Sequence, residues 1–536
     1  MAVAPPLRWH ADGAVSALEA AERLGRALAD VAGPLEARLP AGWRIVKDRP
    51  MRVVVEGRLE SPAGPTAAYA KLRRPTSTWA RTRDRWRGPR GPLEGQVLLA
   101  LAAAGVPVAR PLAWTGDGAD VLVLEAVAPA EDLAAWARRP RDRRERNDMA
   151  EAVGRLLRIA HEAGWTDRDL HRGNLLVSPG GPVLVDPGTR LPEGPLSPPR
   201  RVAALGVAAH GLGPDVRAGL AALRAYTGGD RAAARLWFPL VVVATRHVAR
   251  SYRRGRARRA ARTGRHFEVF EPCGPRSRAV RSLDAAPASW RELAAAWIGA
   301  DPPGARPMKA DGRVAAVRLP DVDAEVVLKR WPATWRDRLR VPRPIRAFRR
   351  AYALRVRGVA CPEPLLAAAG PGGEGVCVTA FAGPADGREV LDLHRATLAR
   401  EGAPAPFDAL PWAERRAALH RLGRFLRRLH DAEVTHRDLK APNLVAWRTP
   451  RGVSFALVDL DGARVRRTRV SWRRRARDLA RLDASVGSPP VSRADRLRVL
   501  DGYYASFERA ALGRRAFARR VARASARKRG PGGRPR

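Results

Sequence analysis

Two kinds of hydrophobic pattern alternate along this chain of 536 residues. Short apolar runs such as 53–55 and 326–328 predict strands, whereas longer runs with apolar residues every three or four positions predict helices. The first such helix is expected from Val15 to Val31, ahead of Gly33-Pro34. The order strands, helix, strands, helices then occurs twice, which predicts a tandem architecture.

An internal repeat covers the most distinctive segment of each half. Residues 154–176 align with residues 423–445 without a gap, and twelve positions are identical. Both segments contain Arg-Asp-Leu followed by Asn-Leu, and both precede an apolar, strand-like run that ends in an aspartate, Asp186 or Asp459. We call the two halves copy one and copy two.

Changes in composition mark the expected boundaries of the copies. Copy one is expected at residues 1–255, a basic and proline-rich linker at 256–290, copy two at 291–525, and a basic, disordered tail at 526–536. Hydrophobic residues make up 45% of the chain, which is enough for a real core in each copy.

The repeated polar residues match the needs of phosphoryl transfer. That reaction depends on metal ions and a lysine at the phosphates, and on a carboxylate that orients the attacking hydroxyl. Asp169 and Asp438 fit the carboxylate role. The residues expected to hold metal are the asparagine five positions later and the aspartate at the strand end, namely Asn174, Asp186, Asn443 and Asp459. The pattern therefore predicts ATP and Mg²⁺ as cofactors.

Lysine is rare in this chain, since only six of the 99 basic residues are lysines. Two of them, Lys71 and Lys329, lie in strand-like runs upstream of the catalytic loops, where a lysine would bind the α- and β-phosphates. A third, Lys440, lies two residues past Asp438 and is expected to reach the γ-phosphate, whereas copy one has His171 there.

Each copy lacks a different supporting residue. Glu94 lies on a helical pattern in copy one and is expected to pair with Lys71, but the matching position in copy two is Ala347. Conversely, Asp478 in copy two could brace the catalytic loop from a following helix, and copy one has Ala204 there. Both copies keep the minimal chemical set.

Several motifs of copy two occur together in one known family. They are Val326-Val327-Leu328-Lys329, His436-Arg437-Asp438-Leu439-Lys440-Ala441-Pro442-Asn443, Val458-Asp459-Leu460-Asp461 and Arg477-Asp478-Leu479. Over about 200 residues this set resembles the lipopolysaccharide kinase (Kdo/WaaP) family, and copy one resembles it more loosely from Lys71 to Gly188. The resemblance implies an α+β fold with two tandem bilobal protein-kinase-like domains, each with a small β-rich N-lobe and a helical C-lobe. It also implies ATP with magnesium and a sugar hydroxyl of the lipopolysaccharide core as acceptor.

Three functions stay open on the sequence alone. The first is an ATP-dependent kinase that acts on a sugar or glycolipid. The second is a serine/threonine protein kinase, although the segment after Asp459 has no Ala-Pro-Glu-like anchor. The third is a protein in which one copy is a regulatory pseudokinase.

The formal net charge of +45 has two interpretations. It could attract an anionic membrane surface, or it could reflect a general bias toward arginine. No base-reading motif is visible, so no specific nucleic acid partner is expected.

The three cysteines are too few for a disulfide framework, and the N-terminus has no apolar core of the signal-peptide type. We expect a cytoplasmic protein that could associate peripherally with the inner face of the membrane.

Overall fold

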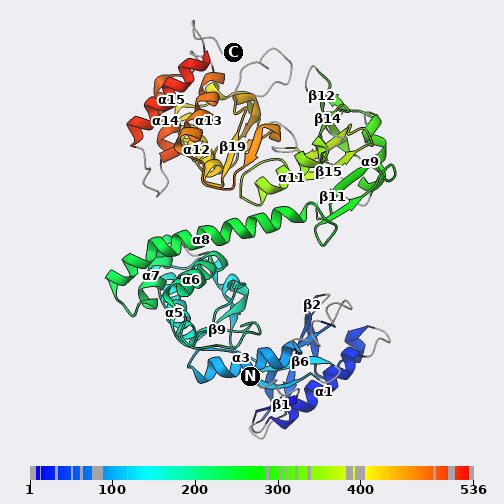
Figure 1. The fold of residues 1–536 in the computed structure, drawn as a ribbon, viewed down its shortest axis with the longest axis vertical. Helices are drawn as coiled ribbons and strands as arrows, with labels where there is room; N and C mark the ends of the chain where they lie inside the picture. The colour runs from blue at the N-terminus through cyan, green and yellow to red at the C-terminus, as the bar shows by residue number, and fades with distance from the viewer. Residues whose placement is uncertain are drawn as a thin grey trace. The chain divides into compact units, whose positions relative to one another are not determined.

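The computed structural model divides the chain into two compact units, Met1–Arg250 and Ser251–Arg536, which we call unit one and unit two. The structure describes residues 8–11, 14–29, 34–49, 52–60, 64–74, 82, 88–116, 119–213, 215–284, 289–300, 303–308, 311–319, 324–334, 340–381, 390–392, 405–486, 491–504 and 513–529. Each unit contains a β-rich lobe and a helical lobe (Figure 1), which confirms the predicted α+β class and the tandem organisation.

The N-terminal lobe of unit one is an antiparallel sheet of order β1-β5-β6-β4-β3-β2. Its strands are β1 (Arg8–His10), β2 (Arg44–Arg49), β3 (Arg52–Leu59), β4 (Thr66–Arg73), β5 (Pro111–Thr115) and β6 (Asp120–Glu125). Helices α1 (Val15–Ala29) and α3 (Arg90–Ala103) pack against this sheet. Helix α1 begins where the hydrophobic pattern predicted and ends at Ala29, while residues 30–33 lie outside the described part of the chain.

The sheet of unit two repeats the core of this arrangement. Its order is β10-β11-β15-β16-β14-β13-β12, so β15-β16-β14-β13 corresponds to β5-β6-β4-β3. The strands are β10 (Phe267–Phe270), β11 (Arg278–Ser282), β12 (Arg306–Pro307), β13 (Val314–Leu319), β14 (Ala324–Trp331), β15 (Pro364–Ala369) and β16 (Gly375–Ala380). Helices α9 (Trp290–Gly299) and α11 (Arg343–Arg355) pack on them.

The segment 256–290, expected from its composition to be a linker, contributes two of these strands. Strand β11 pairs with β15, and β10 pairs with β11 and forms one edge of the sheet. The strands have only four and five residues, and a segment rich in Pro, Ser and Arg separates and flanks them, so their apolar positions do not stand out in the sequence. The first residues of the same segment lie at the end of helix α8 (Arg231–Arg259), within which the division between the two units falls.

The helical lobes share a set of equivalent elements, to which unit two adds a further pair of strands. Unit one has β7 (Glu131–Asp132), α4 (Leu133–Arg138), α5 (Arg143–Glu162), η2 (Arg172–Asn174), β8 (Leu175–Ser178), β9 (Gly181–Leu184), α6 (Pro198–Leu212) and α7 (Val216–Tyr226). Unit two has α12 (Trp412–Asp431), β19 (Val434–His436), η5 (Ala441–Asn443), β20 (Leu444–Trp447), β21 (Ser454–Leu457), η6 (Leu460–Gly462), β22 (Ala463–Val465), α13 (Trp472–Ser485), α14 (Arg493–Tyr504) and α15 (Arg514–Arg529). Of the predicted tail, residues 526–529 lie in α15, and residues 530–536 lie outside the described part of the chain. Among the described helices, none is long and apolar enough to cross a membrane.

A glycine sets the closest helix crossing in each helical lobe. A Cβ on Gly154 in α5 would lie 2.1 Å from the carbonyl oxygen of Ala222 in α7, and a Cβ on Gly423 in α12 would lie 2.1 Å from that of Val499 in α14. No side chain fits at either crossing. Gly154 and Gly423 occupy the same position of the repeat, so both copies use one packing solution.

A buried histidine–tyrosine contact ties the same helices together. His161 Nδ1 lies 2.9 Å from the Tyr226 hydroxyl in unit one, and His430 Nδ1 lies 2.7 Å from the Tyr503 hydroxyl in unit two. Burial lowers the pKa of His161 to about 4, with a smaller contribution from the charge of Arg201. Both histidines are buried, and these contacts place them in the core of their lobe.

Substitution of Gly423 by alanine is expected to lower the free energy of unfolding of unit two by about 1–3 kcal/mol, because α12 and α14 must move apart to admit the Cβ. Gly255, which also lies in a helix of unit two, has no atom within 4 Å of a built Cβ. Gly255→Ala is therefore the matched control and should be neutral or slightly stabilising. Urea denaturation of both variants checks this, and equal midpoints would contradict the crossing argument.

Unit one should lose stability as the pH falls below about 6.5, because an unfolded chain protonates His161 near that pH while the folded unit resists protonation until about pH 4. Between about pH 7 and pH 5 this residue should account for a loss of about 2 kcal/mol. His161→Gln removes the titrating group, so its unfolding should depend less on pH. The measurement is urea denaturation at both pH values, with the exposed His247→Gln as control. Identical pH dependence in H161Q and the unsubstituted protein would contradict the expectation.

Candidate functional site

The strand lysine of unit one lies at the centre of a cluster of charges. Lys71 is on β4, between Val54 of β3 and Leu122 of β6 in the sheet register. Its Nζ forms an ion pair with Glu94 of α3 and donates a hydrogen bond of 2.7 Å to the carbonyl oxygen of Val185. The predicted Lys71–Glu94 pair is therefore present in the structure.

The aspartate that follows β9 joins this cluster. Asp186 Oδ1 lies 3.4 Å from Lys71 Nζ, and Asp186 Oδ2 lies 3.0 Å from Nη1 of Arg52 at the start of β3. Burial alone would raise the pKa of Asp186, but the charges of Lys71 and Arg52 outweigh it and lower that pKa. Burial raises the pKa of Glu94, against the attraction of Lys71. Sequence reasoning missed Arg52, because nothing in a chain so rich in arginine distinguishes it.

The catalytic loop of unit one presents its aspartate to solvent. Asp169 is exposed, and its carboxylate forms no hydrogen bond or ion pair with the described residues. Asn174 is buried, and its side-chain amide donates to the backbone carbonyl of Asp169 at 3.3 Å. Asp167 accepts a hydrogen bond of 3.0 Å from the backbone nitrogen of Asp169 and so shapes the turn.

His171 does not take the place of Lys440. Its Nδ1 accepts a hydrogen bond from the backbone nitrogen of Gly173 at 3.1 Å, which caps the short helix η2. In unit two, Lys440 Nζ lies 2.9 Å from Oδ2 of Asp438 instead. Unit one therefore has no basic side chain from this loop position beside its catalytic-loop aspartate.

The strand lysine of unit two has two carboxylate partners and no glutamate. Lys329 Nζ lies 2.5 Å from Oδ1 of Asp459 and 2.7 Å from Oδ2 of Asp461. Burial would lower the pKa of Lys329, but the hydrogen bonds to the two carboxylates raise it. The position that matches Glu94 in this unit is Ala347, so the helix supplies no carboxylate for this lysine. Asp461, in the Asp459-Leu460-Asp461-Gly462 turn, supplies the second carboxylate that Glu94 supplies in unit one.

An arginine on α11 fixes this turn. Arg350 Nη1 donates hydrogen bonds to the carbonyl oxygens of Leu460 and Asp461, at 2.8 and 2.9 Å. Asp459 has φ of 51°, a left-handed conformation that is uncommon for a residue other than glycine. The turn is therefore held by an arginine of the helix that carries no glutamate, and sequence reasoning did not single this arginine out.

The catalytic loop of unit two is held from two sides. Asn443 donates from its side-chain amide to the backbone carbonyl of Asp438 at 2.7 Å. The buried carboxylate of Asp478 on α13 accepts a hydrogen bond of 3.0 Å from the backbone nitrogen of His436 and an ion pair of 2.8 Å from Arg481. His436 Nε2 in turn lies 3.1 Å from the carbonyl oxygen of Asp459. The brace that the sequence predicted at Asp478 therefore links the loop, through His436, to the turn that contains Asp459 and Asp461.

The donor set in each unit suits a magnesium ion that binds together with phosphate. The described residues contain no group of three or more His, Cys, Asp or Glu side chains that could hold a metal by themselves. Mg²⁺ at nucleotide sites commonly uses one or two carboxylates together with substrate phosphates. Asp186 with Asn174, and Asp459 with Asn443, offer such a partial set of oxygen ligands.

Comparison with known proteins identifies the family. The sequence profile of the lipopolysaccharide kinase (Kdo/WaaP) family matches residues 66–186 and 331–503, more than half of the chain. The first match runs from the start of β4 to Asp186, and the second covers most of unit two. No curated protein matches the chain.

Solved kinase structures are similar to parts of the chain. One is WaaP in complex with acyl carrier protein, with 22% identity over 39% of this chain and 88% of that one, at a TM-score of 0.29. Another is the PknI kinase domain of Mycobacterium tuberculosis, with 16% identity over 38% of this chain and 96% of that one, at a TM-score of 0.25. The two family matches fall in separate units, each of which has its own strand lysine and catalytic loop. The chain is thus a tandem kinase-fold protein that belongs to the lipopolysaccharide kinase (Kdo/WaaP) family.

Proposed function

We propose that this chain is an ATP-dependent kinase that transfers the γ-phosphate of ATP to a hydroxyl of a lipopolysaccharide core sugar or a related glycolipid. One arrangement, present in both units, carries the proposal. In each unit a strand lysine forms an ion pair with the aspartate that follows the C-lobe hairpin, beside a catalytic loop. Membership of a kinase family supports the reaction class. The acceptor is inferred from the same membership.

The residues divide the work of phosphoryl transfer between them. Lys71 and Lys329 would bind the α- and β-phosphates, and Glu94 would hold the first lysine in place. Asp169 and Asp438 would accept the proton of the acceptor hydroxyl and orient its oxygen toward the γ-phosphate. Lys440 lies beside Asp438, where its ammonium would stabilise negative charge on the transferred group.

Asn174 and Asp186 in unit one, and Asn443 and Asp459 in unit two, would hold Mg²⁺. When bound, the ion would neutralise charge on the ATP phosphates. The aspartates now form ion pairs with the strand lysines, so the lysine and the metal would share each carboxylate once ATP is present. The closeness of the strand lysine and the aspartate in each unit supports a site that binds a polyphosphate.

A sugar attached to a lipid lies at a membrane surface, and the net charge of +45 favours contact with anionic lipids. We infer a protein of the cytoplasm that works at the inner face of the membrane. Vesicle sedimentation at low and high salt tests this inference, because an electrostatic contact weakens as ionic strength rises.

Substitution of the catalytic-loop aspartates should separate the contributions of the two units. Asp169→Ala and Asp438→Ala are each expected to lower the turnover of their own unit by about 100-fold or more, because the acceptor hydroxyl loses its general base. The measurement is phosphate transfer from radiolabelled ATP to purified lipopolysaccharide core, with a generic protein acceptor in parallel. Full activity in the double variant would show that the site assignment is wrong, and transfer only to protein would favour a protein kinase. Loss of activity in one single variant alone would show that the other unit is a pseudokinase.

The partner of Lys329 should control nucleotide binding in unit two. In an Asp169→Ala background, Asp461→Asn is expected to raise the KM for ATP roughly three- to tenfold, because the lysine loses one of its two carboxylates. Asp311→Asn is the matched control, since Asp311 of the same unit pairs with the exposed Arg313 and, among the described residues, not with Lys329. An unchanged KM in D461N would remove Asp461 from the site.

A further inference from the structure

Each unit has a pocket beneath its catalytic loop, in the same place of the repeat. The pocket of unit two has a volume of about 360 Å³ and includes Leu422 of α12, Ala441 of η5 and Val499 of α14 in its lining. The pocket of unit one has a volume of about 340 Å³ and includes the equivalent Val153, Arg172 and Ala222. The gap-free alignment pairs Leu422 with Val153 and Ala441 with Arg172. Val499 and Ala222 are equivalent because their carbonyl oxygens lie against Gly423 and Gly154 at the two helix crossings.

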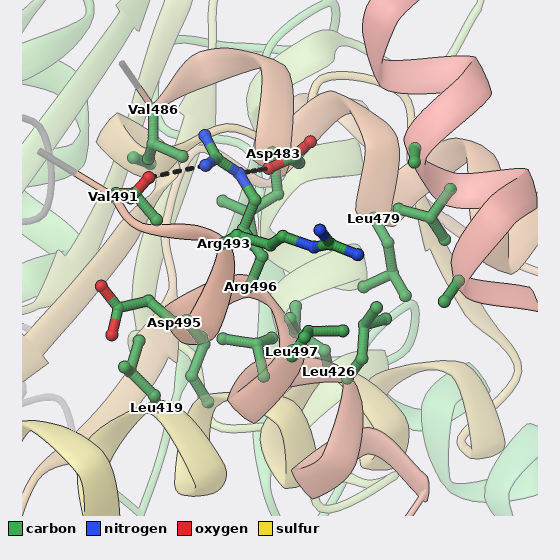
Figure 2. Close-up of a pocket in the computed structure, with 18 of the residues that line it drawn as sticks. Leu419, Leu426, Leu479, Asp483, Val486, Val491, Arg493, Asp495, Arg496 and Leu497 are labelled. Carbon is green, nitrogen blue, oxygen red and sulfur yellow. Dashed lines mark hydrogen bonds and ion pairs between the residues drawn. The ribbon is translucent and has the colours of Figure 1, made fainter. Parts of the chain in front are cut away.

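The two pockets differ in chemistry. Figure 2 shows leucine and valine side chains around the pocket of unit two, together with Arg493 and the two carboxylates Asp483 and Asp495. Asp483 forms an ion pair with Arg496 there. In unit one the lining includes four arginines and a tryptophan, namely Arg139, Arg141, Arg146, Arg172 and Trp136. The guanidinium of Arg141 lies 5.0 Å from the centre of the Trp136 ring.

Loss of an internal carboxylate explains part of this difference. In unit two, Arg415 on α12 forms an ion pair of 2.7 Å with the buried Asp495 on α14. The equivalent arginine in unit one is Arg146, which lies as far before Gly154 as Arg415 lies before Gly423. The residue equivalent to Asp495 is Ala218, because each lies the same number of residues before the tyrosine that contacts the buried histidine. Within the described residues, Arg146 has no carboxylate in ion-pair distance. Its charge therefore lacks the counter-ion that unit two provides.

A second arginine of the pocket also has spare donors. Arg172 uses Nε and Nη2 to donate to the carbonyl oxygens of Leu212 and Gly213 at the end of α6, at 2.5 and 2.9 Å. No carboxylate pairs with it in the described part of unit one, so Nη1 keeps its two N–H donors. These two carbonyl contacts fix the orientation of a guanidinium that lies three residues after Asp169.

The carboxylates near the pocket are already engaged. Arg139 and Arg141 both pair with Glu131, at 2.9 and 3.7 Å, and Arg141 also pairs with Glu145 at 3.2 Å. Asp215 accepts a hydrogen bond from the backbone nitrogen of Ala218 as the N-cap of α7. Two of the four arginines thus remain without a carboxylate, and Nε of Arg141 is a buried donor without a partner in the described structure.

We propose that the pocket formed by α4, α5, η2 and α7 of unit one is a binding site for a phosphate ester, held by Arg146 and Arg172. Guanidinium groups bind phosphate oxygens through pairs of parallel N–H donors, and phosphate supplies the charge that Asp495 supplies in unit two. The phosphate could belong to a sugar phosphate or to a phospholipid headgroup. The proposal concerns binding alone and holds whether or not unit one transfers phosphate.

Isothermal titration of the full chain with glucose 6-phosphate, and with glucose as the neutral comparison, tests the site in the absence of ATP. A sugar phosphate is expected to bind at least about tenfold more tightly than the neutral sugar. If glucose 6-phosphate does not bind, sedimentation with phosphatidylglycerol vesicles tests the headgroup as the source. Binding to neither probe would overturn the proposal.

Two variants place the binding in this pocket. Arg146→Gln removes the charge, and Ala218→Asp introduces the carboxylate that unit two has, so each should weaken phosphate binding about tenfold or more. Arg155→Gln on the same helix is the control, because Arg155 pairs with Glu151 and does not line the pocket. If A218D fails to fold, as judged by its thermal unfolding, R146Q alone decides the matter. Equal affinity in R146Q and the unsubstituted chain would place the phosphate elsewhere and refute the assignment.

Discussion

The ion pair between a strand lysine and the aspartate after the C-lobe hairpin is the interaction on which each site depends. It joins the sheet lobe to the helical lobe of the same unit, through Lys71 and Asp186 in one and Lys329 and Asp459 in the other. Both partners are largely withdrawn from water, so neither charge could remain there alone without a substantial cost. The surrounding contacts either hold the lysine in position or orient the aspartate.

The two units reach this arrangement with different supporting residues. Unit one uses a helix glutamate, Glu94, and a strand arginine, Arg52. Unit two has no glutamate on the equivalent helix. Asp461, from the turn at residues 459–462, supplies the second carboxylate, and Arg350 holds that turn. A lysine needs nearby negative charge, but the element that provides it can change. The asymmetry therefore does not by itself mark either unit as inactive.

The helical lobes likewise share their packing contacts and differ in the residues that line their pockets. Gly154 and Gly423 keep the helix crossings equally close, and His161 and His430 make equivalent contacts with tyrosine. The frame places a pocket at the same position in both units. Differences around it, such as Arg172 in place of Ala441 and Ala218 in place of Asp495, then give one pocket a basic lining and the other a lining of leucine and valine with two carboxylates.

The sequence by itself determined the features that depend on local pattern. The repeat, the tandem order of strands and helices and the Lys71–Glu94 pair follow from periodicity, spacing and the rarity of lysine. The α+β class with two bilobal domains follows from the family resemblance of the repeated motifs. Only the tertiary structure decided which of the many arginines matter, because Arg52, Arg350 and Arg146 are identical in kind to dozens of solvated ones. It also decided that β10 and β11 belong to the sheet of unit two, since short strands gain their stability from pairing with distant neighbours. Contacts between residues more than a hundred positions apart, such as Lys329 with Asp461, have no local signal and arise only when the chain has folded.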